Sequence, residues 1–387
     1  MIAIGLMSGT SLDGVDAALV YIDDEKVELI KFCTLNYTQK FKAKLMRNLC
    51  NETAKLSEIC SLNFELGYWF KNAIDLLLKD TKYHYNDIDF VASHGQTIWH
   101  NPHLKGENIP STLQIGEASV IANETQIPVI SNFRSSDIVV GGEGAPLVPM
   151  SEYILFRSNT ENIILQNIGG VGNLTYLKKN TSINDVMAFD TGPGNIMIDY
   201  FVNKYFNVPF DDGGKIALSG KVIKEIFDYL KEDEFIKRKP PKSTGREQYS
   251  KTSMESLARK LSFDKYNKND IVTTITEFTA YSICYNYLEY IKDFDKVIVS
   301  GGGSHNLYIL KRMEELLEKK VLTQEDLGYS SDAKEAIAFA ILGYLTYNQK
   351  PGNVKSATGA LKSAILGNIT LANDDLKLIK RGIKNGN

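Results

Sequence analysis

One short pattern, an apolar strand followed by a glycine-rich turn and a second strand, occurs twice in this chain of 387 residues. Apolar residues 2–6 lead into a turn at 8–14, and an apolar run resumes at 15–22. Residues 162–165 lead into a second turn at 167–173, and residues 174–177 resume the strand. The two copies lie about 160 residues apart, whereas solenoid repeats recur roughly every 20–50 residues. The pattern therefore predicts two domains with a common core plan.

The rest of the chain alternates between helical periodicity and short apolar runs. Helices are expected at 41–48, 57–80, 118–123, 221–231, 252–261, 275–292, 307–319 and 332–346. Buried strands are expected at 90–93, 129–131, 186–189 and 296–300. Strands that alternate with helices indicate an α/β chain, with a mostly parallel sheet in each half.

Composition excludes several classes of protein. Lys and Arg total 44 against 47 Asp and Glu, so no basic field favours nucleic acid as a partner. No stretch approaches the roughly 18 apolar residues that span a membrane. Four scattered cysteines, with no Cys-x-x-Cys pair, argue against a thiolate zinc site and suggest a reducing compartment. We expect a cytoplasmic enzyme.

The first turn is a candidate phosphate site. Gly9 and Gly14 leave its backbone N–H groups open to phosphate oxygens, and Thr10 and Ser11 add hydroxyl donors. Two carboxylates, Asp13 and Asp16, could reach a divalent metal ion. A plain tight hairpin is the alternative, because Asp-Gly is a strong turn signal.

Asp190 is the main candidate for acid–base chemistry. It directly follows the strand expected at 186–189 and precedes the turn Thr191-Gly192-Pro193-Gly194-Asn195. A carboxylate there could act as a general base or hold a metal-bound phosphate. The alternative is that Asp190 caps the helix expected to begin near Ile196.

A third glycine run lies at 300–306, between an expected strand and an expected helix. Three consecutive glycines, Gly301, Gly302 and Gly303, would let a base or ribose approach the backbone, although a flexible loop is the alternative. The phosphate-loop motif and the complete dinucleotide fingerprint are both absent from the sequence.

Residues 93–103 contain three histidines, His94, His100 and His103. A metal site is one interpretation, but no zinc spacing supports it, and Gly95 and Pro102 favour a loop. Gln96, Thr97 and Trp99 are typical of polar and stacking contacts to a sugar, and a capped loop with an aromatic anchor is the alternative.

Two further charged residues are candidates for substrate contacts. Arg134 lies before the glycine-rich stretch 141–146 and could bind a carboxylate or phosphate, or form a surface ion pair. Glu335, in the helix expected at 332–346, would by default lie on a solvated face.

Together these motifs resemble the anhydro-N-acetylmuramic acid kinases, a family of the sugar kinase, actin and chaperone-ATPase superfamily. The resemblance covers nearly the whole chain. It is carried by residues 4–16, 93–100, 113–117, 141–149, 167–170, 189–195, 241–247, 300–306 and 334–336.

The resemblance implies two actin-like (ribonuclease H-like) domains with mixed, mostly parallel sheets around a central cleft. We expect the first domain at 1–132 with about 347–387, and the second at 133–346. It implies a segment that binds the ATP phosphates, formed by Gly9, Thr10, Ser11, Leu12, Asp13, Gly14, Val15 and Asp16. Further ATP contacts are expected at Gly169, Gly170, Gly192, Gly301, Gly302 and Gly303.

The resemblance also implies a reaction. Asp190 matches the family's catalytic base, and Gln96, Arg134 and Glu335 fall on motifs of the sugar side. Water would open 1,6-anhydro-N-acetylmuramic acid, and the freed O6 would take the γ-phosphoryl group of ATP, with Mg²⁺ as cofactor. The product, N-acetylmuramic acid 6-phosphate, belongs to peptidoglycan recycling and amino-sugar catabolism. A homodimer is also implied.

One departure from the superfamily bears on the metal. Met7 and Asn167 stand near the places where the superfamily usually has Asp, so Asp13 and Asp16 are expected as ligands instead. Three other readings stay open: a kinase of the same fold for another sugar or a carboxylate, a non-catalytic actin-like ATPase, and a metal-dependent relative that uses histidines in the 94–103 segment.

Overall fold

The computed structural model describes residues 1–9, 12–104, 106–245 and 248–372, and it divides into two compact units. The first unit comprises Met1–Leu155 and the segment from Asp332 onward, and the second comprises Phe156–Ser331. From the sequence, the first boundary is expected after residue 132, whereas in the structure the first unit extends to Leu155. The second boundary is expected near residue 347, whereas in the structure the chain returns to the first unit already at Asp332. In the structure, the helices on either side of residue 140 and the helix after residue 333 therefore belong to the first unit.

The first unit is built on a seven-stranded sheet in the order β12-β6-β4-β1-β2-β3, with β5 paired to β4. Its strands are β1 (Ile2–Ser8), β2 (Gly14–Ile22), β3 (Val27–Asn36), β4 (Phe90–Asn101), β5 (Ser111–Ile115), β6 (Val129–Ser131) and β12 (Asn368–Thr370). Its helices are α1 (Gln39–Arg47), α2 (Leu56–Leu78), α3 (Ala118–Thr125), α4 (Phe133–Val139), α5 (Val148–Phe156), α13 (Lys334–Tyr347) and α14 (Lys355–Thr358).

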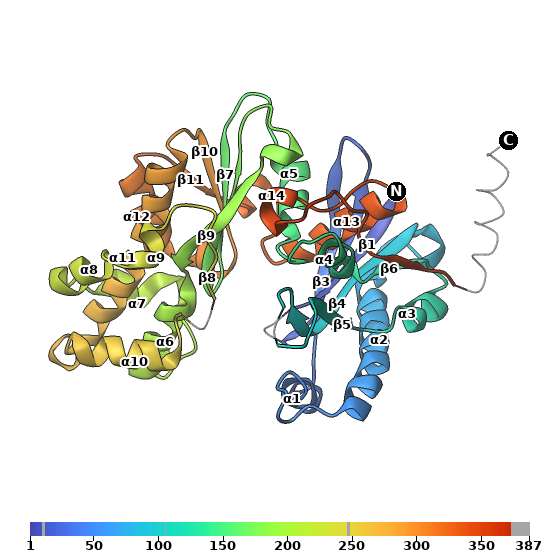
Figure 1. The fold of residues 1–387 in the computed structure, drawn as a ribbon, viewed down its shortest axis with the longest axis horizontal. Coiled ribbons are helices and arrows are strands. Elements are labelled where there is room, and N and C mark those ends of the chain that lie inside the picture. Colours follow the sequence, from blue (N-terminus) through green and yellow to red (C-terminus); the bar gives the residue numbers. More distant parts are fainter. Residues whose placement is uncertain (10–11, 105, 246–247, 373–387) are drawn as a thin grey trace. The chain divides into compact units, whose positions relative to one another are not determined.

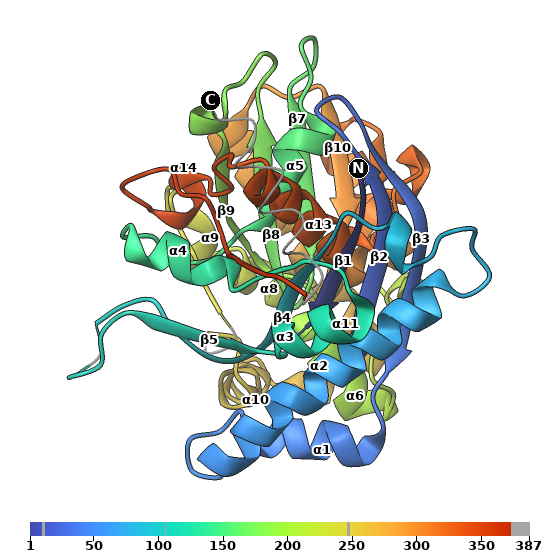
Figure 2. The same cartoon turned by 90° about the vertical axis from the view of Figure 1, so that its right-hand side faces the viewer.

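Helices cover both faces of this sheet. Alternate residues of β1, such as Ile4, point into an apolar core shared with α2, which Figure 2 shows running past the sheet. Gly5 faces the other way, toward α13, where a Cβ atom would meet the carbonyl oxygen of Ala336 at 1.8 Å. The late helix α13 therefore packs directly on the first strand of the chain, and glycine makes that approach possible.

The second unit has a five-stranded sheet in the order β11-β10-β7-β8-β9, beside which helices α6 to α12 gather (Figure 1). Its strands are β7 (Ile163–Ile168), β8 (Val171–Leu177), β9 (Met187–Pro193), β10 (Lys296–Ser300) and β11 (Val321–Thr323). Its helices are α6 (Asn195–Phe206), α7 (Lys215–Ser219), α8 (Lys224–Leu230), α9 (Glu234–Lys237), α10 (Lys251–Lys260), α11 (Lys268–Asn286) and α12 (Leu307–Leu317).

The two units share one strand plan. In each, three antiparallel strands follow one another along the chain, and a later strand pairs in parallel with the first of them. The expected two-copy α/β fold with mixed sheets is thus confirmed. Parallel pairing does not dominate, however. The described strands make four parallel and six antiparallel pairings, and five of the six antiparallel pairings join strands that follow one another in the chain.

Two expected loops are strand in the structure. Residues 93–101 continue β4 instead of leaving the sheet, because β5 pairs with them and irregularities near Ser8 and near Trp99 bend the strand without ending it. Residues 190–193 continue β9, because the start of β8 pairs with them across another irregularity. Bulges of this kind redirect a strand, and apolar periodicity does not reveal them.

Candidate functional site

Asp190 lies within β9 of the second unit, half-buried, with its carboxylate held on one side only. Its Oδ2 accepts hydrogen bonds from the Thr244 N–H at 2.8 Å and from the Ser243 hydroxyl at 3.2 Å. Among the described residues, none donates to Oδ1. Burial raises the pKa of Asp190, while Thr244, Ser243 and the charge of Lys242 act in the opposite direction. Asp190 does not cap α6, whose N-cap is Gly194.

Three glycine turns converge near the start of α6. The Gly169 and Gly170 carbonyls accept from the N–H groups of residues 194–196 at 2.8–3.1 Å. A Cβ on Gly194 would meet the Gly169 oxygen at 2.2 Å, and one on Gly303 would meet Ile168 Cγ2 at 2.2 Å. The first N–H groups of α6 therefore point into the protein and are not free for an anion.

The predicted ATP glycines of this unit differ in access. Gly170 and Gly302 are exposed, Gly169 and Gly301 are half-buried, and Gly192 and Gly303 are buried. Only the first four could offer backbone atoms to a ligand without rearrangement. Gly301 has a φ of 81°, and a Cβ there would meet Asn167 Oδ1 at 2.5 Å. Glycine is required at this turn for both reasons.

In the first unit, the hairpin between β1 and β2 could offer a ligand mainly its backbone atoms. Thr10 and Ser11 lie outside the described residues. Leu12 and Val15 are buried in the core, so they could contribute only backbone atoms to a ligand. Gly14 begins β2, and a Cβ there would meet the Leu35 oxygen at 2.4 Å. Gly9 is half-buried, and its carbonyl accepts from the Leu12 N–H at 3.3 Å.

The two aspartates of this hairpin are already partnered. Asp13 is exposed and its Oδ1 lies 2.5 Å from Lys42 Nζ. The Asp16 carboxylate accepts from the Thr34 hydroxyl at 2.6 Å. Burial raises the pKa of Asp16, and the negative charges of Asp332 and Asp13 raise it further. No cluster of three metal-ligating side chains occurs among the described residues, so an all-protein cage is not present there.

Arg134 sits at the start of α4 and is held from two sides. Its Nε donates to His94 Nε2 at 2.9 Å, and its Nη1 donates to the Gly144 carbonyl at 2.7 Å. Its Nη2 has no partner among the described residues. Gly144 is itself fixed, since its N–H donates to buried Asp137 at 2.8 Å. Glu335 is near enough to stabilise the charged form of Arg134.

This arrangement removes His94 as a metal ligand. Its Nδ1 lies 2.9 Å from the Gly95 carbonyl and its Nε2 accepts from Arg134, so both ring nitrogens are engaged. Burial, and secondly the charge of Arg134, lower the pKa of His94, which keeps the ring neutral. The histidine-metal reading of 94–103 therefore lacks its first ligand.

Glu335 occupies the first turn of α13 and is exposed. Its pKa is nevertheless raised, first by partial removal from water and further by Asp16, against the charges of Lys334 and Arg134. Glu335 thus interacts electrostatically with Arg134, 201 residues earlier in the chain, and with Asp16, 319 residues earlier.

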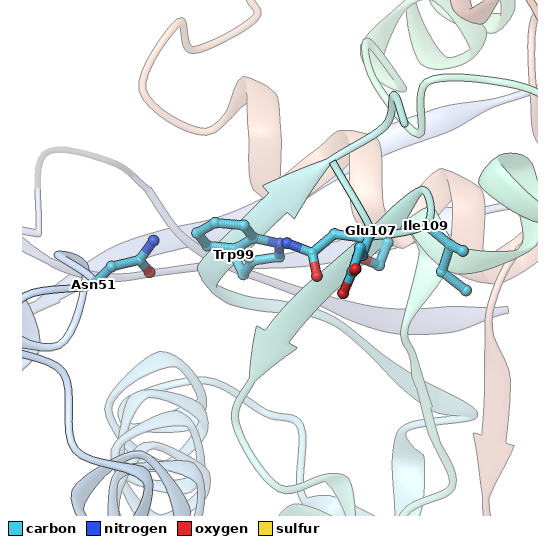
Figure 3. Close-up of a pocket in the computed structure, with 6 residues that line it drawn as sticks. Asn51, Trp99, Glu107 and Ile109 are labelled. Carbon is cyan, nitrogen blue, oxygen red and sulfur yellow. The ribbon is translucent and has the colours of Figure 1, made fainter. Parts of the chain in front are cut away.

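Gln96 is a core residue with 1% exposure. Its Oε1 accepts from the Ser8 hydroxyl at 2.6 Å, and Ser8 also bonds the Tyr37 hydroxyl at 2.8 Å. Trp99, by contrast, lines an open pocket of about 510 Å³ with Asn51 and Glu107 (Figure 3). Gln96 and Trp99 therefore lie on the same strand, β4, but in different surroundings: Gln96 in the core and Trp99 at the open pocket.

The residues that hold these groups are not among the predicted site residues, although segment 241–247 carries part of the family resemblance. Ser243 and Thr244 orient Asp190 from more than 50 residues away. Asp137, fully buried, ties the 141–144 loop to Asn353 and Thr358 at 2.8 and 2.9 Å. A buried carboxylate beside a glycine run carries no signal in local periodicity. Arg246 and Glu247, in the motif of 241–247, lie outside the described residues.

Comparison with known proteins extends over the whole site. The family model for anhydro-N-acetylmuramic acid kinase matches residues 1–372. Proteins of that name from Bacillus cereus strains G9842 and 03BB102 are 49% and 48% identical over 376 residues, covering 95% of this chain and 98% of each relative. A solved structure, the activator of 2-hydroxyisocaproyl-CoA dehydratase from Clostridium difficile with bound ADPNP, is 13% identical with a TM-score of 0.45, covering 90% of this chain and 97% of that one.

The family match spans both units and includes every motif described above, and it ends at residue 372. The chain is therefore a member of the anhydro-N-acetylmuramic acid kinase family.

Proposed function

We propose that this chain uses ATP and water to convert 1,6-anhydro-N-acetylmuramic acid into N-acetylmuramic acid 6-phosphate and ADP, with Asp190 as the general base. The single observation that carries the assignment of the base is the asymmetry of its carboxylate. Oδ2 is fixed by two donors, and among the described residues none reaches Oδ1. One oxygen positions the group, which leaves the other to accept a proton from water.

The proposed reaction joins two bond changes. Water attacks the anomeric carbon and gives its proton to Asp190 Oδ1, and the bond from that carbon to O6 breaks. O6 then takes the γ-phosphoryl group, and ADP leaves. A raised pKa makes Asp190 a stronger base, because burial destabilises its charged form. The Thr244 and Ser243 hydrogen bonds act in the opposite direction and limit that rise in pKa.

The phosphates are assigned to glycine backbones in the proposal. Gly9 and the neighbouring hairpin in the first unit, and Gly170 and Gly302 in the second, offer exposed or half-exposed main chain. Backbone N–H groups bind anionic oxygens without the entropy cost of ordering side chains. ATP is the phosphoryl donor that membership of the family favours.

The acidic residues of the first unit fit Mg²⁺ as a hydrated ion. Asp16 feels the charges of both Asp13 and Asp332, and a cation at this place would relieve that repulsion. Mg²⁺ usually keeps several waters and takes only one or two carboxylates together with substrate phosphates. Asp16 is the better ligand, because Asp13 is engaged by Lys42. When bound, Mg²⁺ would neutralise charge that develops on the transferred phosphoryl group.

Arg134 is proposed to bind the carboxylate of the substrate's lactyl group. Two of its nitrogens are fixed by His94 and Gly144, so the free Nη2 has a defined direction. A guanidinium held in this way recognises carboxylates with little loss of side-chain entropy. Gln96 would act through Ser8, and Glu335 would bind a sugar hydroxyl.

Two wider assignments complete the proposal. We place the enzyme in the cytoplasm, where ATP is available and where its free cysteines, Cys33, Cys50, Cys60 and Cys284, would stay reduced. We also expect a homodimer. None of the described helices is long and apolar enough to cross a membrane.

The activity is tested by incubating the protein with ATP and single candidate sugars, followed by mass spectrometry of the products. The expected product from the anhydro sugar is heavier by one water and one phosphoryl group. N-acetylglucosamine and glucose serve as controls for a plain sugar kinase. A product that gains the phosphoryl group without water, from any of the sugars, would favour the alternative of a simple kinase of this fold.

A further inference from the structure

Lys242 is a buried lysine without a carboxylate partner among the described residues. It is 5% exposed, although a lysine side chain is almost never fully buried unless it is paired. Its ammonium donates to the carbonyls of Phe235 and Ile236 at 3.2 and 2.9 Å, at the end of α9. Burial of an unpaired ammonium is costly, and an apolar side chain of similar volume would avoid that cost.

Aromatic rings surround the same ammonium. Its Nζ lies 5.9 Å from the ring centre of Phe189, 5.1 Å from Phe235 and 5.2 Å from Tyr290. Their faces stabilise a cation where water is excluded. Phe235 and Ile236 belong to the apolar core of the second unit, so the carbonyls that hold Lys242 are themselves fixed.

From Lys242 the chain leads directly to Asp190. The Lys242 carbonyl accepts from the Asp190 N–H at 3.1 Å. The next two residues, Ser243 and Thr244, supply both donors to Asp190 Oδ2. Buried Lys242 therefore directly precedes the two residues that donate every hydrogen bond from the described residues to the Asp190 carboxylate.

We infer that Lys242 is a positioning residue: it fastens segment 241–244 to the core so that Ser243 and Thr244 hold the Asp190 carboxylate in one orientation. This inference rests on the proposed role of Asp190 as the base. The Lys242 ammonium is hydrogen-bonded to the α9 carbonyls and not to the Asp190 carboxylate, so its effect on that carboxylate would pass through Ser243 and Thr244. Its charge also favours the ionised carboxylate of Asp190, without forming an ion pair.

The titration of Lys242 is consistent with this setting. Its pKa is lowered to about 8, mainly by burial and then by Arg238, against the opposing charges of Asp233 and Asp190. Tyr290 also faces the ammonium, with its hydroxyl donating to the Lys237 carbonyl at 2.7 Å.

The test compares Lys242→Met, which keeps the length and removes the charge, with Lys237→Met. Lys237 lies at the end of the same helix α9 but is bonded to Glu232 at the surface, so it is a matched control. Loss of a fixed catalytic geometry costs on the order of 100-fold in rate. We expect Lys242→Met to lower kcat by about 10- to 100-fold with little change in KM, and Lys237→Met to behave as the unmodified protein.

The pH dependence of kcat separates positioning from a general loss of stability. Without the nearby cation and the fixed donors, the pKa of Asp190 rises, so the acid limb of the profile should move to higher pH in Lys242→Met. If Lys242→Met does not fold, two other variants are measured. Lys242→Gln removes the charge but keeps a hydrogen-bond donor for the α9 carbonyls, and Ser243→Ala removes the exposed hydroxyl that donates to Asp190 Oδ2. Both should move the acid limb in the same direction.

A folded Lys242→Met enzyme with the original kcat and acid limb overturns the inference, and so does an original acid limb in Ser243→Ala. Asp190→Asn is measured in parallel. An inactive Asp190→Asn with an unaffected Lys242→Met would leave the base assigned and remove only the positioning role. An active Asp190→Asn would instead remove the base on which both rest.

Discussion

At the scale of single residues, the surroundings of Asp190 distinguish its two carboxylate oxygens. The carboxylate is desolvated enough to be more basic than an ordinary Asp, and two donors on Oδ2 keep its orientation. The charged form of Asp190 is expected to lower the stability of the folded protein, because burial disfavours a charge at this position. Function and stability should therefore respond in opposite directions to its removal.

Asp190→Asn keeps the shape and removes the base. We expect kcat to fall by about 10²–10⁴-fold, the usual contribution of one general base. Substrate and ATP binding should persist, because the change acts mainly on the transition state. The midpoint of thermal unfolding should not fall, since the folded state no longer holds a desolvated charge. Asp185→Asn, at an exposed residue of the short 3-10 helix before β9, is the control, and calorimetry with steady-state kinetics measures both effects.

The acid limb of the unmodified enzyme gives the same information by pH. A general base works when deprotonated, so kcat/KM should fall as pH drops through the pKa of Asp190. Burial places that pKa above the ordinary value of about 3.9. An Asp190→Asn variant with near-normal turnover would move the base elsewhere, and Glu335, whose pKa is also raised, would be examined next.

At the scale of elements, the glycines of the turns meet two different structural requirements. Gly194 and Gly303 exist because backbones and side chains come too close for a Cβ, whereas Gly302 has only Asn195 Nδ2 at 3.5 Å from the place of a Cβ. The first two are therefore structural, and Gly302 has room for a side chain. This difference allows the packing role of Gly194 to be tested separately from the proposed ATP contact at Gly302.

Gly194→Ala and Gly302→Ala form a matched pair. We expect Gly194→Ala to lower the free energy of unfolding of the protein by about 1–3 kcal/mol, because its Cβ would overlap the Gly169 carbonyl. Gly302→Ala should leave stability unchanged within about 0.5 kcal/mol and weaken ATP binding. Urea denaturation and calorimetry check the two effects, and equal loss of stability in both variants would contradict the division.

Gly9→Val tests the other proposed phosphate-binding element, the hairpin between β1 and β2. A branched side chain at half-buried Gly9 would obstruct the approach of phosphates to the backbone. ATP affinity should fall while the circular dichroism spectrum stays unchanged. An unchanged affinity in a folded variant would remove the hairpin from the nucleotide site.

The sequence predicts elements better than the contacts between them. Residues 2–22 and 162–177 could be assigned because apolar runs broken by glycine turns define hairpins locally. The extension of β4 and β9 could not, because it depends on partner strands and bulges. Asp190 could be singled out from its neighbours, but the Thr244 N–H that holds it comes from 54 residues away, and the buried state of Lys242 has no local signal.

At the scale of the whole molecule, the chain divides into two units with one strand plan, and the late segment from Asp332 returns to the first. The return is fixed by the close approach of α13 to Gly5. A helix from the end of the chain thus packs on the first strand, so neither end of the first unit should fold without the other.

We predict that the protein is a homodimer. Light scattering on the purified protein at micromolar concentration should give a mass of twice the 43.3 kDa chain. A mass near that of one chain would contradict the prediction, and dilution series would show whether the dimer dissociates in the measured range.

The central claim is that water attacks the sugar and that the freed O6 attacks phosphorus. The most direct measurement is a single turnover of 1,6-anhydro-N-acetylmuramic acid and ATP in oxygen-18 water, with the product analysed by mass spectrometry before the anomeric position exchanges. If water attacks the sugar, one heavy oxygen is expected at the anomeric carbon and none in the phosphoryl group. Heavy oxygen in the phosphoryl group, with an unlabelled anomeric carbon, would contradict it.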